Sequence, residues 1–244
     1  MASTVSKSQR FLQAFGEIER SLRRGSSSPK DIGFYRLVDL VGVDNPVIRR
    51  FKVDLKQYAD LRNAIVHDRI GGVVIAEPHE RVVQRIETIA ALIQRPPRVL
   101  PVFERRVLTL RSDDTLEAAL KTMLKHSFSQ IPVISREDFI GLLTANTITR
   151  WLASRSQSDW DSITPISSVL DCAEDVDNHC FLPGNATIFD AMDSFHTYEE
   201  LGKRLEAVLI TESGKSSSKI KGIITVSDLP RILKEMEKRK TTVE

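Results

Sequence analysis

The stretch Gly222-Ile223-Ile224-Thr225-Val226-Ser227-Asp228 decides how the second half of this chain is read. Its apolar residues are typical of a short buried strand, and the polar residues from Thr225 to Asp228 are typical of a helix start. Gly141-Leu142-Leu143-Thr144-Ala145-Asn146-Thr147 has the same order of residue types, with Thr147 in the place of the aspartate. The pattern predicts a strand that runs directly into a helix, twice in one chain.

The similarity extends outward from these two stretches. The first copy predicts a strand, a helix, two strands and a helix from VLTL, LEAALKTMLKH, IPVI, FIGLLT and ITRWLAS. The second copy gives the same order through PGNATIFDAMDSFHTY, LEAVLIT, KIKGIIT and SDLPRILKEME. A period of roughly 80 residues in two copies indicates duplicated α+β domains rather than a solenoid.

The chain before Pro96-Pro97 has a different pattern. Apolar residues recur at steps of three or four over 6–24, 33–41, 51–68 and from Pro78 to about residue 95, which predicts four helices. The two prolines favour a stiff linker. We therefore expect a helical domain over 1–95 and two further domains over 98–158 and 163–238.

Composition excludes several classes of protein. The chain has 244 residues, 41% hydrophobic and 28% charged, and its net charge of +2 is too small to argue for DNA or a membrane surface. No apolar run approaches the roughly 18 residues of a membrane span, and the first ten residues are polar, so we expect a cytoplasmic protein. The two cysteines, Cys172 and Cys180, have no zinc-site or CxxC spacing, and we expect no metal.

The two copies resemble the CBS family. Gly222 to Asp228 fits the family's pattern of glycine, apolar residues, threonine or serine, two variable residues and aspartate in full, whereas Gly141 to Thr147 lacks the acid. The resemblance implies an α+β fold with two tandem CBS domains of βαββα order after the helical bundle. It also implies a regulatory protein, rarely an enzyme, that requires no cofactor and binds an adenine nucleotide (ATP, ADP or AMP) between the copies.

Thr225 and Asp228 have the chemistry that such a ligand needs. A threonine beside a helix N-terminus can hydrogen-bond a phosphate or sugar oxygen, since backbone N–H groups there favour anions. A carboxylate one turn later can accept hydrogen bonds from two vicinal ribose hydroxyls. The alternative is that both residues only cap the helix.

The resemblance also implies which residues complete each cleft. Thr225 and Asp228 would be joined by Phe128, Gln130 and Ile131, which border the base, and by His126 near the phosphate. His126 at a helix C-terminus without a ligand role is the other interpretation. The second cleft would combine Thr144 and Thr147 with Arg204, Glu206 and Ala207. Because Thr147 replaces the acid, we expect this site to be degenerate and the chain to bind one nucleotide.

The third predicted helix contains Leu61-Arg62-Asn63-Ala64-Ile65-Val66-His67-Asp68, which resembles the HEPN family of four-helix domains. In active members this motif lines a groove between two protomers and cleaves RNA. His67 would act as general acid or base, Arg62 would hold the scissile phosphate, and Asn63 at i,i+4 would orient His67. The alternative is a polar helix end in which Arg62 pairs with an acid and His67 caps the C-terminus.

Three hypotheses follow. In the first, the CBS pair senses an adenine nucleotide and transmits its state to a helical domain that forms a homodimer. In the second, the chain is an enzyme, a nucleotide-gated HEPN-type ribonuclease with RNA as its partner. In the third, both clefts are empty and the chain is a structural interaction module.

Overall fold

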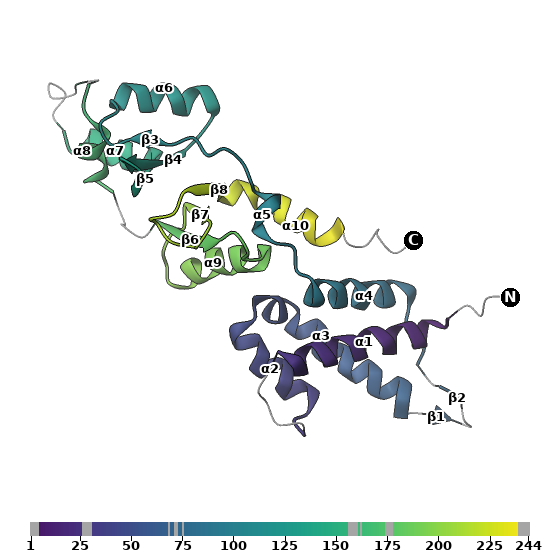
Figure 1. The fold of residues 1–244 in the computed structure, drawn as a ribbon. Coiled ribbons are helices and arrows are strands. Elements are labelled where there is room, and N and C mark those ends of the chain that lie inside the picture. The colour runs from purple at the N-terminus through teal and green to yellow at the C-terminus, as the bar shows by residue number, and fades with distance from the viewer. Residues whose placement is uncertain are drawn as a thin grey trace. The chain divides into compact units, whose positions relative to one another are not determined.

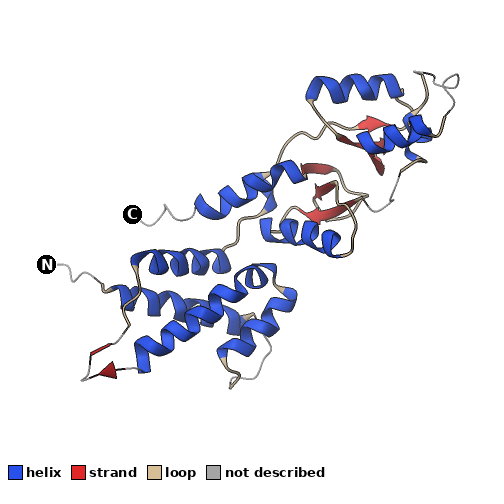
Figure 2. Cartoon of the chain, turned by 180° about the vertical axis from the view of Figure 1, so that it is seen from behind, coloured by secondary structure: helices blue, strands red, loops and turns tan. Residues whose placement is uncertain are grey.

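Two compact units make up the chain in the computed structural model, which describes residues 5–25, 31–67, 69–70, 73–74, 76–155, 161, 163–173 and 178–238. The helical unit comprises Met1–Pro97 with Arg231–Glu244, and the repeat unit comprises Arg98–Pro230. Figure 1 labels their helices and strands, and Figure 2 shows that the two larger sheets both belong to the repeat unit. The division after Pro97 coincides with the predicted linker.

The described residues before Pro97 contain the four helices that the apolar spacing predicts, in the predicted order. They are α1 (Lys7–Arg24), α2 (Phe34–Asp44), α3 (Pro46–His67) and α4 (Glu80–Gln94). Ser6 begins α1 with a capping box to Gln9, and the His79 side chain accepts from the Arg81 amide at the start of α4. Two short antiparallel strands, β1 (Arg69–Ile70) and β2 (Val73–Val74), lie between α3 and α4 in the chain. The segment from Gly71 to Pro78 is described only in part.

The helical unit is held by an apolar core and by ion pairs between α1 and α4. Phe11 is fully buried and meets Tyr58 of α3 edge to face, with ring centroids 5.8 Å apart. Burial raises the pKa of the Tyr58 phenol to about 12. Arg10 donates to Glu87 at 2.9 and 2.8 Å and to Glu80 at 2.8 Å, which fixes how α1 lies against α4.

The repeat unit contains two copies of one arrangement (Figure 1). The first repeat is β3 (Leu110–Arg111), α6 (Leu116–His126), β4 (Gln130–Ser135), β5 (Asp138–Thr144) and α7 (Ala145–Ala153). The second repeat is β6 (His179–Pro183), α9 (Ile188–Glu200), β7 (Ala207–Thr211), β8 (Ile220–Ile224) and the short 3₁₀ turn η2 (Val226–Asp228). It continues into α10 (Leu229–Lys238), which belongs to the helical unit from Arg231 onward. Two short helices, α5 (Val99–Val102) and α8 (Ile166–Leu170), precede the respective repeats. The α+β fold class expected from the sequence is confirmed.

The two sheets share one topology and one register. In each, the first strand pairs parallel with the second, and the second pairs antiparallel with the third, in the orders β3-β4-β5 and β6-β7-β8. Pro132 lies opposite Leu142, and Leu209 lies opposite Ile223. Each hairpin also has a register shift, after Val133 and after Ile210. The second repeat therefore carries Leu209 where the first carries Pro132.

The segments that precede the two repeats are exchanged. The Val99 amide donates to the Ala186 carbonyl at 2.8 Å, so the segment before the first repeat packs on the second. Reciprocally, the Ile166 amide donates to the Asp114 carbonyl at 2.9 Å, so α8 packs on the first repeat. The predicted boundary at residue 163 assigned α8 to the second CBS domain, but its side chains complete the core of the first.

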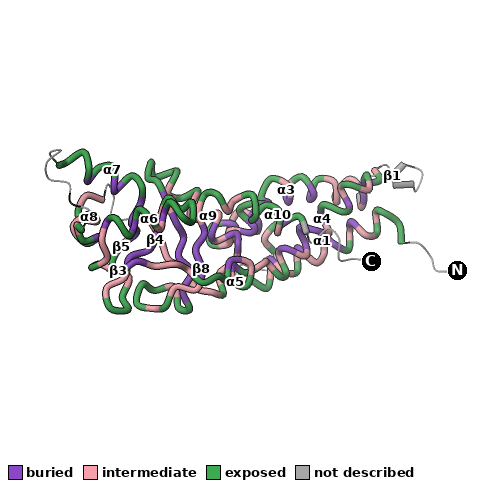
Figure 3. The backbone as a smooth tube through the Cα atoms, turned by 90° about the horizontal axis from the view of Figure 1, so that it is seen from above, coloured by how far each residue is buried: buried purple, intermediate pink, exposed green. Residues whose placement is uncertain are grey.

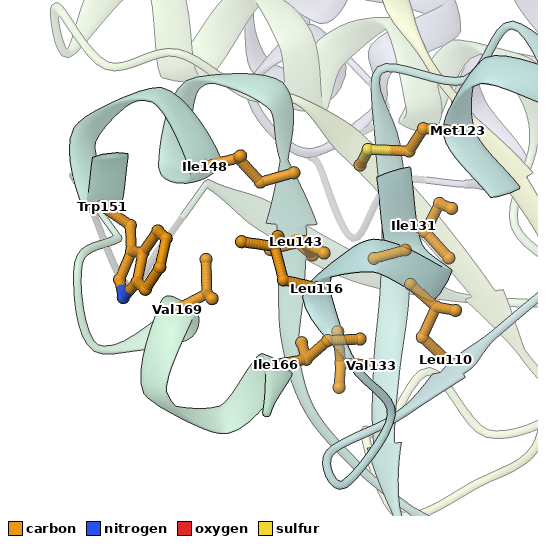
Figure 4. Close-up of a cluster of buried hydrophobic side chains, with 11 residues drawn as sticks. Leu110, Leu116, Met123, Ile131, Val133, Leu143, Ile148, Trp151, Ile166 and Val169 are labelled. Atoms are coloured by element: carbon orange, nitrogen blue, oxygen red, sulfur yellow. The ribbon is translucent and has the colours of Figure 1, made fainter. Parts of the chain in front are cut away.

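Figure 4 shows this first core. Leu116 of α6, Val133 and Leu143 of the sheet, Trp151 of α7 and Val169 of α8 converge between the sheet and its helices. Leu116, Val133, Leu143 and Val169 are each 0% exposed. Strands β4, β5, β7 and β8 carry runs of buried residues, seen as purple stretches in Figure 3, because helices cover one face of each sheet and apolar residues of the other repeat pack on part of the second face.

A second apolar cluster joins the two repeats. Leu142 of β5 packs with Ala207, Leu209 and Ile223 of the second sheet. Phe139 and Phe181 meet edge to face beside them, with centroids 5.1 Å apart. Since this contact is apolar and buried, it holds the open faces of the two sheets together and fixes the clefts on either side.

Candidate functional site: a cavity between the two repeats

A cavity of about 400 Å³ opens where three segments of the repeat unit meet. These segments are the chain that leads into β3, the α6–β4 turn with the start of β4, and the junction of β8 with α10. The lining residues are Arg105, Arg106, Val107, Leu108, His126, Ser127, Phe128, Ser129, Gln130, Pro132, Ile223, Thr225, Ser227 and Asp228. Five of the six residues predicted for the better cleft thus lie around one cavity.

Thr225 and Asp228 are placed by the end of β8. The Thr225 amide donates to Asp228 Oδ2 at 2.9 Å, and the Thr225 hydroxyl donates to the same oxygen at 3.2 Å. This is the capping arrangement that the sequence also allowed. Because both donors reach Oδ2, and no described residue donates to Oδ1, one carboxylate oxygen is left for a ligand. The capping and ligand interpretations are therefore compatible.

Arg105 is the residue that the sequence interpretation missed. Its Nη2 donates to the Ile223 carbonyl at 2.6 Å and to Asp228 Oδ2 at 3.3 Å. The Asp228 side chain is 15% exposed and the Arg105 side chain 43% exposed, so the ion pair lies at the cavity wall. In the sequence, the adjacent arginines Arg105 and Arg106 before the first strand could have indicated that a positively charged segment lines the cavity. Asp228, the partner of Arg105, lies 123 residues away in the sequence.

Another part of the cavity wall is aromatic and lies at the end of α6, where His126 and Phe128 line the cavity. Ser127 has a φ of +54°, a left-handed conformation that ends the helix, and the Phe128 amide then donates to the Met123 carbonyl at 2.9 Å. Phe128 is 44% exposed, and its ring stacks on His126 with centroids 5.3 Å apart and 22° between planes. The His126 ring covers one face of the Phe128 ring, and the exposed part of Phe128 offers an aromatic surface on which a base can stack.

Gln130 and Ile131, the first two residues of β4, point to opposite faces of the strand. Gln130 lines the cavity, and its Nε2 donates to the Glu206 carbonyl at 3.2 Å. Ile131 is 0% exposed and belongs to the first core, so it does not line the cavity. Successive side chains of a strand point to opposite faces, which places Gln130 and Pro132 at the cavity and Ile131 beneath it.

A second cavity of about 260 Å³ corresponds to the cleft expected to be degenerate. Its lining residues are Thr144, Asn146, Thr147, Asn178, Gly202, Lys203, Arg204 and Glu206. The Thr144 and Thr147 hydroxyl oxygens are 2.9 Å apart, in the place of the Thr225–Asp228 pair. Arg204 Nε lies 2.8 Å from Glu206 Oε1. Ala207, also predicted here, is fully buried between the sheets and does not line the cavity.

The residues of the predicted ribonuclease motif lie on the last turns of α3. Arg62 Nη1 donates to the Asn63 amide oxygen at 3.2 Å, and Asn63 is exposed. His67 is the last residue of α3, and its side chain lies outside the described residues. The catalytic roles of Arg62, Asn63 and His67, and the HEPN-like character of the helical unit, therefore stay predictions.

The described residues show neither a cluster of metal ligands nor a helix that could cross a membrane. They contain no group of three or more His, Cys, Asp or Glu side chains arranged to hold a metal ion. Within the same described ranges, every helix falls short of the length or the apolar character that crossing a bilayer requires.

The chain is similar to several solved CBS structures. A CBS-domain protein of Agrobacterium tumefaciens is 18% identical, with a TM-score of 0.41 over 53% of this chain and 85% of that one. The CBS domain of a bacterial CNNM/CorC family Mg²⁺ transporter, in complex with ATP, is 16% identical, with a TM-score of 0.44 over 66% of this chain and 98% of that one. A CBS domain pair in complex with 5-methylthioadenosine and S-adenosyl-L-methionine is 16% identical, with a TM-score of 0.43 over 57% of this chain and 98% of that one.

No curated protein matches the chain at a significant level. The family model of the CBS domain matches residues 99–154, which cover α5 and the first repeat. The fuller glycine-to-aspartate pattern, Gly222 to Asp228, lies beyond that match in the second repeat, which has the same strand order and register. Residues 99–154 of this chain therefore form a CBS domain.

Proposed function

We propose that the protein is a sensor that binds one adenine nucleotide in the cavity lined by Thr225 and Asp228. CBS domains commonly bind adenine nucleotides and serve regulatory roles, which sets the class of ligand to test. The observation that carries the proposal is Asp228 itself: its Oδ2 is held by Thr225, its Oδ1 has no donor among the described residues, and it faces a cavity with an exposed aromatic ring.

Each part of a nucleotide has a partner in this cavity. Asp228 accepts hydrogen bonds from the ribose hydroxyls, which a carboxylate does with two oxygens at once. Phe128 offers a ring face to the base, where stacking contributes roughly 0.5–1.5 kcal/mol beyond area burial. Arg105, Arg106 and His126 provide donors for phosphate oxygens.

One nucleotide per chain follows from the difference between the two cavities. Thr147 offers one hydroxyl, and that hydroxyl already lies 2.9 Å from the hydroxyl of Thr144. It offers a single neutral oxygen, whereas a carboxylate offers two charged ones that can each accept from one ribose hydroxyl. Arg204 is also paired with Glu206 in that cavity. We therefore assign the nucleotide to the first cavity alone.

The regulatory part of the proposal concerns the helical unit. Arg105 belongs to the segment that follows directly from α4 through Pro96 and Pro97, so a ligand that moves this segment acts on the chain leading to the helices. We propose that the nucleotide changes the state of a homodimer formed by the helical unit. Such coupling requires that the ligand bind two arrangements with unequal affinity.

Isothermal titration calorimetry with ATP, ADP and AMP tests the binding site. We expect Asp228→Ala to weaken binding at least tenfold, because charged hydrogen bonds contribute about 1.5–3 kcal/mol each. Asp113→Ala is the matched control: Asp113 also pairs with an arginine, Arg111 at 3.0 Å, but lies outside the cavity and should leave affinity unchanged. The proposal fails if no nucleotide binds at millimolar concentration or if Asp228→Ala binds as the wild type does.

Sedimentation velocity tests the regulatory part. We expect a dimer whose dissociation constant changes when saturating nucleotide is added, and we expect Asp228→Ala to remove that change. A sedimentation profile that is the same with and without a nucleotide shown to bind would contradict the coupling and leave the binding site standing.

A further inference from the structure

We propose that the Arg105–Asp228 ion pair makes the cavity select phosphorylated nucleosides over unphosphorylated ones. This inference rests on the proposed nucleotide site and adds a specificity determinant to it. Before the ligand binds, Arg105 occupies the Asp228 carboxylate, which is the acceptor for the ribose hydroxyls. Once the ribose has displaced Arg105 from Asp228, the same arginine can pair with the phosphate of the ligand.

The first step of the argument is the occupancy of Asp228 Oδ2. Three donors reach this oxygen: the Thr225 amide at 2.9 Å, the Thr225 hydroxyl at 3.2 Å and Arg105 Nη2 at 3.3 Å. A carboxylate offers about four lone-pair sites over both oxygens, so Oδ2 is saturated. Oδ1 is open to one ribose hydroxyl, and a ribose diol that bonds both carboxylate oxygens must displace a donor from Oδ2.

Arg105 is the donor that leaves. Its contact is the longest of the three, whereas both Thr225 donors belong to the same tight turn as Asp228 and cannot move independently. Arg105 also keeps its hydrogen bond to the Ile223 carbonyl at 2.6 Å, so its guanidinium stays at the cavity wall. Ribose binding thus removes the carboxylate partner of a cation that remains beside the ligand.

A phosphate group compensates for that loss, and a bare nucleoside does not. Arg105 and Arg106 both line the cavity, and Asp228 is the single acid among its lining residues. When ribose takes the carboxylate, the remaining charge at the wall is positive. A phosphate can accept two parallel hydrogen bonds from the freed guanidinium, whereas adenosine leaves it unpaired.

The second cavity has neither an arginine nor an aspartate at the positions that correspond to Arg105 and Asp228. Leu170 lies against Gly141, as the Phe103 carbonyl lies against Gly222. Two residues farther along, Arg105 in the first cavity therefore corresponds to Cys172, while Thr147 corresponds to Asp228. Arginine and aspartate thus occur together at the first cavity, whereas cysteine and threonine occupy the two corresponding chain positions, which fits a pair that acts together.

Calorimetry with adenosine and AMP tests the selection. In Arg105→Gln the ribose no longer competes with a cation, and we expect adenosine to bind about two- to fivefold more tightly, the range of a partly exposed ion pair. We expect AMP to bind about tenfold more weakly, because a charged hydrogen bond is lost. Arg106→Gln is the comparison variant: it removes the same charge from the same cavity without releasing Asp228, so any gain in adenosine affinity should be smaller than that of Arg105→Gln.

A wild-type experiment gives the same answer without relying on a variant that must fold. Inorganic pyrophosphate should pair with Arg105 and release Asp228, and adenosine should then bind two- to fivefold more tightly than in sodium chloride of equal ionic strength. The coupling must be reciprocal, so adenosine should tighten pyrophosphate by the same factor. Independent binding of the two probes would overturn the proposal.

Two further results would overturn it: equal affinity of the wild type for adenosine and AMP, or the same gain in adenosine affinity for Arg105→Gln and Arg106→Gln. If AMP binds and Asp228→Ala abolishes its binding while these tests fail, the nucleotide site stands and the selection by Arg105 is wrong. If neither AMP nor adenosine binds the wild type, both proposals fall together.

Discussion

Replacing Gly222 by alanine should damage the cavity, whereas the same change at Gly141 should not. A Cβ on Gly222 would lie 2.5 Å from the Phe103 carbonyl oxygen and 3.0 Å from Ile210 Cδ1. The first of these contacts is with backbone, so the segment carrying Phe103 must move. A Cβ on Gly141 would meet Leu170 Cδ1 at 3.4 Å, and a leucine side chain can rotate away.

The expected cost follows from what holds that segment. Overpacking typically destabilises by about 1–3 kcal/mol, and here the shift also strains the hydrogen bond from the Arg105 amide to the Lys221 carbonyl at 3.1 Å. We expect Gly222→Ala to lower the free energy of unfolding by about 2–3 kcal/mol, toward the upper end of that range. We expect Gly141→Ala to stay within about 0.5 kcal/mol of the wild type, as surface substitutions usually do.

Urea denaturation followed by circular dichroism measures the stability, and AMP titration measures the site. Because Arg105 follows Phe103 by two residues, Gly222→Ala should also weaken AMP binding, while Gly141→Ala should not. Equal stability of the two variants would refute the reasoning, since it would mean that the segment before the first repeat does not pack on β8 as closely as the distances state.

Two further predictions concern the second cavity and the helical unit. Thr147→Asp should give the second cavity a carboxylate and raise the nucleotide stoichiometry in calorimetry from one to two per chain; a folded variant that still binds one would show that the missing acid is not what disables this cavity. Arg10→Gln should lower the thermal midpoint at neutral pH, because Arg10 holds the pKa of the Glu80 carboxyl below its usual value. A carboxyl whose pKa is lower in the folded than in the unfolded protein stabilises the fold at pH values above its unfolded pKa, and this stabilisation is lost as the pH falls through its folded pKa. The difference in thermal midpoint from the wild type should therefore shrink below about pH 4. A difference that persists at pH 3 would contradict this origin.

The elements of this protein were largely predictable because their signals are local. Apolar spacing placed α1 within one residue of its observed start, and the duplicated strand–helix order predicted the first sheet and the β7–β8 hairpin of the second, whereas β6 was not predicted. The Thr225–Asp228 contact was predictable for the same reason, since residues three apart at a helix start are neighbours in any sequence that folds this way. Strand alternation could also have separated Gln130 from Ile131, and that signal was in the sequence.

Long-range packing decided the rest. The exchange of α5 and α8 between the repeats, and with it the true extent of the first core, depends on contacts between segments far apart in the chain. Arg105 reaches Asp228 across 123 residues, because the Phe103 segment lies against Gly222 and delivers the arginine to the cavity. No pattern in either segment specifies the other.

The sequence by itself therefore determined the two classes of domain, the duplication and the difference between Asp228 and Thr147, all of which follow from local periodicity and from comparing one stretch with another. The tertiary structure alone decided that Asp228 already has a cationic partner and that Ile131 and Ala207 are core residues. The physical reason is that backbone periodicity fixes which side chains share a face, while burial of apolar surface fixes which faces meet.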